Sequence, residues 1–209
     1  MKYEVFSVAK WISVLFLFLH SGLGFAQILP EAELRKQPVY RSLEAALKEP
    51  EKVYRLHLKR KPKADSLPEA VFALTNLQEL SVQRCKLLRL NNRINEFKNL
   101  QYLILDHNRL VWLPDELCDL NELKVLSINN NLLYKLPDDL GQLQKLEQLN
   151  AWGNPLYVFP ESIIMLMESL QVMDLRQIPF RLEEIEILEI RLPKTDIRYT
   201  PFCDCKINR

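Results

Sequence analysis

The stretch LQYLILDHNRLVWLPDELCDLNELKVL, residues 100–126, almost repeats itself, because from Leu123 the chain reads LKVLSINNNLLYKLPDDLGQLQKLEQL. Asn108 aligns with Asn131 and Pro114 with Pro137, an offset of 23 residues in both cases. The leading apolar residues of the successive units are Val53, Leu77, Leu100, Leu123, Leu146 and Leu170. This nearly constant spacing indicates a tandem array of one structural unit.

Each unit follows the approximate pattern L-x-x-L-x-L-x-x-N-x-L-x-x-L-P-x-x-L-x-x-L. The L-x-L pair, such as Leu103 and Leu105, has a period of two, so both side chains point to one side of a short strand. A single strand with one apolar side cannot bury that side alone, whereas equivalent strands stacked side by side bury it continuously. We therefore expect a solenoid of short parallel strands.

An asparagine recurs where the chain leaves each strand, at Asn108, Asn131 and Asn154, and Cys85 takes this position in an earlier unit. A short amide here can bond to backbone groups of its own turn and of the neighbouring unit, which stacking would otherwise leave buried without partners. The proline that follows in most units is expected to stop strand pairing and to return the chain along the outer side.

This pattern resembles the leucine-rich repeat family over about residues 53–180, and its L-x-x-L-P spacing is most similar to the repeats of Scribble and Ras-suppressor proteins. The resemblance implies an α/β solenoid: a horseshoe with short parallel strands on the concave face, irregular or helical segments on the convex face, and helical caps. It also implies a module that binds a protein or peptide and performs no catalysis. Similar units occur in many exported bacterial proteins.

Both ends of the array carry sequences typical of caps. Residues 40–50 space their leucines one helical turn apart behind Ser42, a possible N-cap. Residues 181–190 place Leu182, Ile185 and Leu188 near one helical face, and residues 195–200 alternate and could add a last strand. Residues 27–39 have no clear structural pattern. The predicted organisation is a signal peptide over 1–26, a lead-in and capping helix over 27–52, repeats over 53–180, and a C-terminal cap and tail over 181–209.

The first 26 residues have the pattern of a secretory signal. An apolar run, Trp11–Leu19, is followed by Gly24 and Ala26, which are the small residues that signal peptidase requires. Cleavage is expected before Gln27. The alternative is an uncleaved membrane anchor, but the run is shorter than the about 20 residues that span a bilayer. We therefore expect an exported protein that is secreted, periplasmic or attached to the cell surface.

The charge of the remaining chain is balanced. The whole sequence has 28 Lys and Arg and 27 Asp and Glu, and the loss of Lys2, Lys10 and Glu4 with the signal leaves a net charge of zero. The charge of the whole molecule therefore gives no reason to expect nucleic acid or an anionic membrane as the partner. The basic cluster at residues 57–63 has no stacking aromatic residues beside it, which weakens a nucleic-acid interpretation further.

No motif for catalysis, a cofactor or a metal is present. After residue 26 the only glycines are Gly141 and Gly153, too few for a P-loop or a Rossmann turn. Cys203 and Cys205 are too close for an easy disulfide with each other, and nearby histidines are lacking for a metal site. We expect a protein that is not an enzyme. The alternatives are a hydrolytic site near His107 and Asp106, or a glycan or surface adhesion module that uses aromatic side chains.

The outward-facing strand positions form the expected binding surface on the concave face. By register, the first row is Arg55, Glu79, Tyr102, Val125, Gln148 and Val172. The second row is His57, Ser81, Ile104, Ser127, Asn150 and Asp174, and the third is Lys59, Gln83, Asp106, Asn129, Trp152 and Arg176. The predicted partner contacts are Tyr102, Ile104, Val125, Asn150, Trp152 and Asp174, with Arg55, His57 and Lys59 at the basic end.

Tyr102 and Trp152 are the main hot-spot candidates, because a binding hot spot needs large apolar groups on an outward face. The alternative is that these side chains only shield one another. Seven strands span ~29 Å and four residues of strand ~13 Å, which gives a surface of about 380 Å². This is less than the roughly 800 Å² that each partner contributes to a standard interface. Either the rim loops take part, or the ligand is a peptide, or binding is weak.

Overall fold

The computed structural model describes residues 27–60 and 65–201, so the predicted signal peptide and the Cys203–Cys205 pair lie outside the described residues. Residues 27–60 contain helix α2 (Glu31–Leu34), strand β1 (Val39–Tyr40), helix α3 (Leu43–Ala46), the 3-10 helix η1 (Pro50–Lys52) and strand β2 (Arg55–Lys59). The later strands are β3 (Glu79–Gln83), β4 (Tyr102–Ile104), β5 (Val125–Ser127), β6 (Gln148–Asn150), β7 (Val172–Leu175) and β8 (Asp196–Tyr199). The later helices are the 3-10 helices η2 (Glu69–Ala73), η3 (Asn92–Glu96), η4 (Asp115–Asp119), η5 (Leu140–Gln142) and η6 (Glu161–Leu166), and the α-helix α4 (Leu182–Arg191).

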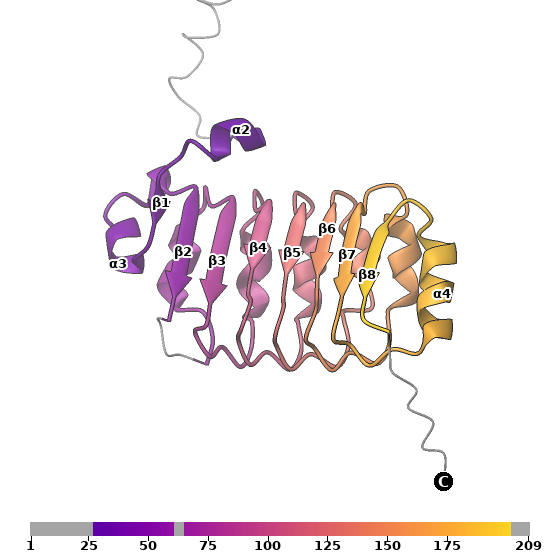
Figure 1. Ribbon diagram of the computed structural model, residues 1–209. Coiled ribbons are helices and arrows are strands. Elements are labelled where there is room, and N and C mark those ends of the chain that lie inside the picture. The colour runs from indigo at the N-terminus through magenta and orange to yellow at the C-terminus, as the bar shows by residue number, and fades with distance from the viewer. Residues whose placement is uncertain (1–26, 61–64, 202–209) are drawn as a thin grey trace, which may run out of the picture.

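All eight strands form one parallel sheet in which the spatial order equals the chain order (Figure 1). Arg55 pairs with Glu79, Glu79 with Tyr102, and Tyr102 with Val125, which is the register that the repeat predicts. Each of strands β2 to β6 is followed by a 3-10 helix that lies behind the sheet, so the molecule has a strand layer and a helix layer (Figure 1). The predicted α/β solenoid is therefore confirmed.

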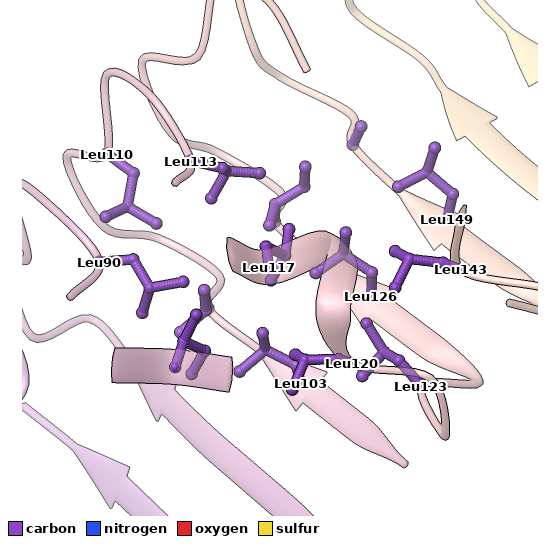
Figure 2. Packing of buried hydrophobic residues seen from close by; sticks show 14 of the residues in the cluster. Leu90, Leu103, Leu110, Leu113, Leu117, Leu120, Leu123, Leu126, Leu143 and Leu149 are labelled. Atoms are coloured by element: carbon purple, nitrogen blue, oxygen red, sulfur yellow. The ribbon is translucent and has the colours of Figure 1, made fainter. Parts of the chain in front are cut away.

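Leucines fill the space between the two layers. Figure 2 shows Leu103 and Leu126, from neighbouring strands, directed into the same interior as Leu117 and Leu120 from the η4 segment. All four side chains are fully buried. Replacing one such leucine by alanine typically costs about 2–5 kcal/mol, and every repeat contributes several of them. The core therefore runs the length of the array and is built repeat by repeat.

The predicted asparagine ladder is present. The Asn108 side-chain oxygen accepts hydrogen bonds from the backbone N–H groups of Cys85 (3.0 Å) and Leu87 (3.2 Å) in the preceding repeat. Its amide nitrogen donates to the carbonyl of Val82 (2.7 Å) in that repeat and to that of Leu105 (2.8 Å) in its own. Asn131 and Asn154 repeat this arrangement one and two units further along. The ladder satisfies backbone groups that stacking has buried.

A left-handed backbone conformation also recurs once per repeat, directly after the third outward row. The residues with positive φ at this turn are Arg60, Arg84, His107, Asn130, Gly153 and Gln177. The chain reverses sharply here while its backbone still bonds to the next repeat: His107 N–H donates to the carbonyl of Asn129 (2.8 Å). Non-glycine residues tolerate this conformation at a cost of about 1–2 kcal/mol each, so the turn is held by the stacking around it.

The N-terminal region contains more structure than the sequence predicted. Residues 27–39 were expected to have no clear structure, and this expectation is wrong because they include α2 and the start of β1. β1 adds an eighth strand by pairing with β2, Val39 beside Arg55. It carries none of the repeat's leucines, so no periodicity marked it. The Ser42 side chain caps α3 as expected, by accepting a hydrogen bond from the N–H of Ala45 (3.4 Å).

At the C-terminal end, α4 closes the core with Ile185 and Leu188, both of which are buried. The prediction that Leu182 shares this buried face is wrong: its side chain is exposed because it lies in the first turn of the helix, beyond the last repeat. β8 then pairs with β7, as the alternating sequence suggested. Within residues 27–60 and 65–201, no helix has the length and apolarity needed to cross a membrane.

Candidate functional site

The sheet face, meaning the three outward-facing rows of strands β2 to β7 that the sequence analysis defined, is the candidate site. The strand pairing confirms the register of the first two rows. The structure shows, however, that the face is not uniform. Its N-terminal part is a buried charged cluster under a cover, and its C-terminal part is open.

The charged cluster is centred on Glu79, whose side chain is only 2% exposed. One of its carboxylate oxygens accepts a hydrogen bond from Arg55 Nε (2.8 Å), and the other contacts His57 Nε2. Arg35, from the lead-in, also reaches this carboxylate (3.3 Å). Burial by itself raises the pKa of Glu79, but the hydrogen bonds and positive charges of His57 and Arg55 outweigh it and lower the pKa to about 2. The predicted contacts Arg55 and His57 are therefore engaged within the protein.

Residues 27–35 cover the first row at β3 and β4. Gln101 Nε2 donates to the carbonyl of Leu29 (2.8 Å), and the Leu29 N–H donates to Gln78 Oε1 (2.9 Å). The Arg35 guanidinium lies 4.7 Å from the centre of the Tyr102 ring. In Figure 1, α2 lies above the amino ends of β3 and β4.

The prediction that Tyr102 is an exposed hot spot is therefore wrong, since its side chain is 5% exposed beneath this cover. Burial, together with the negative charge of Glu31, raises the pKa of its phenol to about 12. The Tyr102 side chain instead packs against the lead-in of the same chain, through the contact with Arg35.

The open part of the face begins at β4. Ile104, Val125, Asn150 and Val172 are partly exposed there, with no described element over them. Trp152 is also partly exposed, and its ring meets the His107 ring edge-to-face, with 6.3 Å between ring centres. The structure thus brings four predicted contacts, Ile104, Val125, Asn150 and Trp152, together on one uncovered surface.

Asp174 differs from the other predicted contacts on this part of the face. Its carboxylate is buried and receives hydrogen bonds from Arg176 Nε (2.9 Å) and a terminal nitrogen of the same guanidinium (2.7 Å). Burial raises the pKa of Asp174, but the bonds and charge of Arg176 outweigh this effect and the net pKa is lowered. A ligand at this point therefore meets the exposed Arg176 guanidinium rather than a free carboxylate.

A cavity of about 350 Å³ opens at the carboxyl end of β2. Its lining includes His57 and Lys59, which the sequence predicted as contacts, and also Arg41, Ser81 and Gln83. Arg41 was missed because it follows the unpredicted strand β1. Ser81 and Gln83 stood in the predicted rows but were not among the predicted contacts. The polar groups of this cavity can donate hydrogen bonds to an anionic or amide group of a ligand.

The alternative hydrolytic site is not assembled. The Asp106 carboxylate accepts hydrogen bonds from Ser127 Oγ (2.8 Å) and from the Asn129 N–H (2.9 Å), while the exposed His107 ring packs against Trp152. In the described part of the chain, no hydrogen bond joins the His107 ring to Asp106 or Ser127, as a nucleophile–base pair requires. Across the same residues, no group of three His, Cys, Asp or Glu could hold a metal.

Comparison with known proteins identifies the repeat. Residues 98–156 match the family model for leucine-rich repeats. The structure is similar to that of a leucine-rich repeat protein of Leptospira interrogans, with 30% identity, a TM-score of 0.58, and coverage of 78% of this chain and 46% of that one. A comparison with curated proteins finds no match.

A second similar structure is the leucine-rich repeat ectodomain of the Arabidopsis thaliana membrane receptor kinase GASSHO1/SCHENGEN3, in complex with CASPARIAN STRIP INTEGRITY FACTOR 2. The identity is 21% and the TM-score 0.54, with coverage of 77% of this chain and 22% of that one. The chain thus spans less than half the length of either relative. With its repeating leucines, its asparagine ladder and its single parallel sheet, the chain is a leucine-rich repeat protein.

Proposed function

We propose that this leucine-rich repeat protein is exported and binds a segment of another protein, in extended form, across the open part of its sheet face, without catalysing a reaction. The fold is that of a protein interaction module. The observation that carries the proposal is the set of apolar side chains left uncovered in the middle of a polar sheet: Ile104, Val125 and Trp152. Partly exposed apolar groups at the centre of a surface, with polar groups around them, are typical of an interface.

The size of the open surface favours a peptide. From β4 to β7 there are three gaps between strands, or ~14 Å, and the strands give ~13 Å of height, so the open area is about 180 Å². A standard globular partner covers roughly 800 Å². An extended segment lying across the strands needs less surface, and its backbone can bond to side chains such as Asn150 and Gln148.

The plant ectodomain, which has the same fold, was solved in complex with a partner, and this supports the proposal that the present chain also binds one. The proposal of no catalysis is supported by the partners of these side chains in the described part of the chain, where Asp106 bonds to Ser127 and the His107 ring packs against Trp152. Export is supported by the sequence of residues 1–26.

The direct test is selection from a displayed library of random linear peptides on the purified chain. The matched variants are Trp152→Ala, on the sheet face, and Trp112→Ala, on the loops beyond the strands, since both side chains are tryptophans that are partly exposed to solvent. We expect peptides whose affinity falls about tenfold or more with Trp152→Ala and stays unchanged with Trp112→Ala.

A library that yields no binder to the folded chain would count against a peptide ligand. Binders that are insensitive to Trp152→Ala and to Val125→Ala would move the site away from the sheet face.

A further inference from the structure

A second surface lies at the edge of the solenoid where the chain leaves each strand. We define the loop edge as four equivalent segments, residues 84–90, 107–113, 130–136 and 153–159. These loops follow the strand arrowheads and form the lower edge of the molecule in Figure 1. They share no residue with the sheet face, so the loop edge is a surface separate from the proposed peptide site.

Large apolar side chains are exposed along the whole loop edge. Trp112 is 41% exposed and Tyr157 62% exposed. The exposed apolar residues of the loop edge are Leu88, Val111, Trp112, Leu132, Tyr134, Tyr157 and Val158. Nearly half of the chain's exposed large hydrophobic side chains within the described residues therefore lie on this one edge.

These side chains form one continuous strip. Adjacent segments bond to each other through the backbone: the Arg109 N–H donates to the Leu87 carbonyl (2.8 Å) and the Tyr157 N–H to the Tyr134 carbonyl (3.2 Å). The rings of Tyr134 and Tyr157 lie nearly parallel, with 6.2 Å between their centres. Because the repeats stack at about 4.8 Å, the four segments place bulky apolar groups in a straight row roughly 14 Å long.

The charges of the loop edge all have one sign. The four segments contain five basic residues, Arg84, Lys86, Arg89, Arg109 and Lys135, and no Asp or Glu. Among the described residues, the only ion pair that any of the five makes is the 3.9 Å contact of Lys135 with Asp138. The protein's overall charge is close to zero, but its charges are segregated, and this edge is basic and aromatic at once.

We propose that the loop edge is a membrane-contact surface that seats the protein on anionic lipid. Tryptophan and tyrosine prefer the boundary between lipid headgroups and hydrocarbon, where one end of the side chain is apolar and the other is hydrated. Lysine and arginine near an anionic leaflet each strengthen binding roughly fivefold. The loop edge supplies both features on a row of projecting loops.

A lipid surface fits the shape of the loop edge better than a protein partner does. Protein hot spots lie in pockets that a rim shields from water. Here the exposed side chains lie in a line along the loops. A row of projecting aromatic and aliphatic groups can enter a soft interface without a complementary cavity. Seated in this way, the protein would leave its sheet face accessible to a peptide.

The test is binding of the purified full chain to vesicles of phosphatidylcholine containing phosphatidylglycerol, with vesicles of phosphatidylcholine alone in parallel. The edge variant is Trp112→Ala with Tyr157→Ala, and Trp152→Ala on the sheet face is the matched control. We expect the edge variant to lower the partition coefficient about tenfold, because two aromatic side chains no longer enter the interface. We expect Trp152→Ala to leave it unchanged.

The charge variant is Arg84→Gln with Arg89→Gln and Arg109→Gln. It should weaken binding to the anionic vesicles by about tenfold or more, while binding to phosphatidylcholine alone changes little. Added salt should likewise weaken the binding of the parent chain to the anionic vesicles.

Three results would overturn the proposal. The first is that the folded parent chain does not bind anionic vesicles. The second is equal binding by the parent and the edge variant, which would place the contact elsewhere, including residues 1–26. The third is displacement from vesicles by polyglutamate or by a single-stranded oligonucleotide at concentrations that do not disturb the vesicle, with tighter binding to that polymer than to lipid, which would identify an acidic polymer as the partner. Circular dichroism of each variant establishes that it is folded.

Discussion

Glu79 is the residue on which the N-terminal part of the sheet face depends. It is a buried carboxylate that Arg55, His57 and Arg35 surround. A buried charge of this kind is stable only while its partners are present, since the removal of one partner leaves the others buried without compensation. The strand positions that the sequence offered as ligand contacts therefore serve internal stability here.

The pKa of Glu79 gives a pH prediction with a definite sign. Its folded-state value of about 2 lies below the ordinary 4.5. The ionised carboxylate therefore stabilises the fold above about pH 5, and this contribution is lost as the pH falls towards 2. This shift in pKa corresponds to a contribution on the order of 3 kcal/mol to the free energy of unfolding. Urea unfolding of the parent chain at a series of pH values should show this loss.

The Glu79→Gln variant should be less stable at pH 7 and should lose less stability than the parent between pH 5 and pH 2. The matched control is Glu49→Gln, where an exposed glutamate pairs with Lys52 on the surface. Exposed pairs of this kind contribute little to stability because water and salt screen them, so the control should follow the parent's pH profile. If Glu79→Gln also follows that profile, another carboxylate is responsible for the acid sensitivity.

The lead-in element, residues 27–40, is a cover rather than an unstructured extension. α2 is too short to be stable alone, because isolated helices of this length do not form in water. Its position is fixed by the fully buried Leu34, by backbone bonds to Gln78 and Gln101, and by the contact of Arg35 with Tyr102. Elements held by few contacts open at a lower free energy than the core does.

Leu34→Ala should therefore release the cover without unfolding the repeats. Hydrogen exchange is expected to become faster in residues 31–37 and to stay slow in β4 to β7. The pKa of Tyr102, now about 12, should fall towards 10, because burial is the main cause of its elevation; spectrophotometric titration measures this change. Leu47→Ala, at an exposed leucine after α3, is the control and should alter neither quantity. An unchanged Tyr102 titration in Leu34→Ala would mean that the cover is held by its polar contacts alone.

At the scale of the whole molecule, the charges are sorted by surface. The loop edge is basic, whereas 3-10 helices that follow its segments in the chain begin with acidic residues, for example Asp115 and Glu161. A net charge near zero thus conceals two surfaces of different character, and a partner responds to the local field rather than to the total charge. The sheet face and the loop edge are separate, so one protein of this size can hold a peptide and contact a lipid surface at the same time.

Export is the condition under which both proposals are useful, and it can be tested directly. We expect the chain isolated from its producing cells to begin at Gln27, because Gly24 and Ala26 fit the specificity of signal peptidase. Intact-mass measurement and N-terminal sequencing of the envelope and medium fractions check this prediction. A variant with Ala26→Arg, which removes the small residue at the cleavage site, should accumulate uncleaved. A parent chain that retains Met1 and stays in the cytosolic fraction would contradict the prediction.

The sequence by itself determined the repeat unit and its consequences. Residues such as Leu103, Asn108 and Pro114 act within one unit or between neighbouring units, so their spacing alone predicts the strand, the core, the asparagine ladder and the register of the rows. These interactions join only neighbouring repeats. Because the repeats recur every 23 residues, the interactions can be predicted from the sequence without the tertiary structure.

The tertiary structure decided which outward residues are accessible. Tyr102 and Glu79 stand in the same row as Val125, yet only Val125 is open, because residues 27–35 return over the first strands from outside the repeat and carry no period of their own. The loop edge is a second surface that the sequence alone did not predict. Its residues, 23 positions apart from Leu88 to Val111, Tyr134 and Tyr157, become one strip only when the repeats stack. The net charge of the sequence does not show how its charges are distributed over the folded surface. A partner binds the local surface that the stacking of the repeats creates.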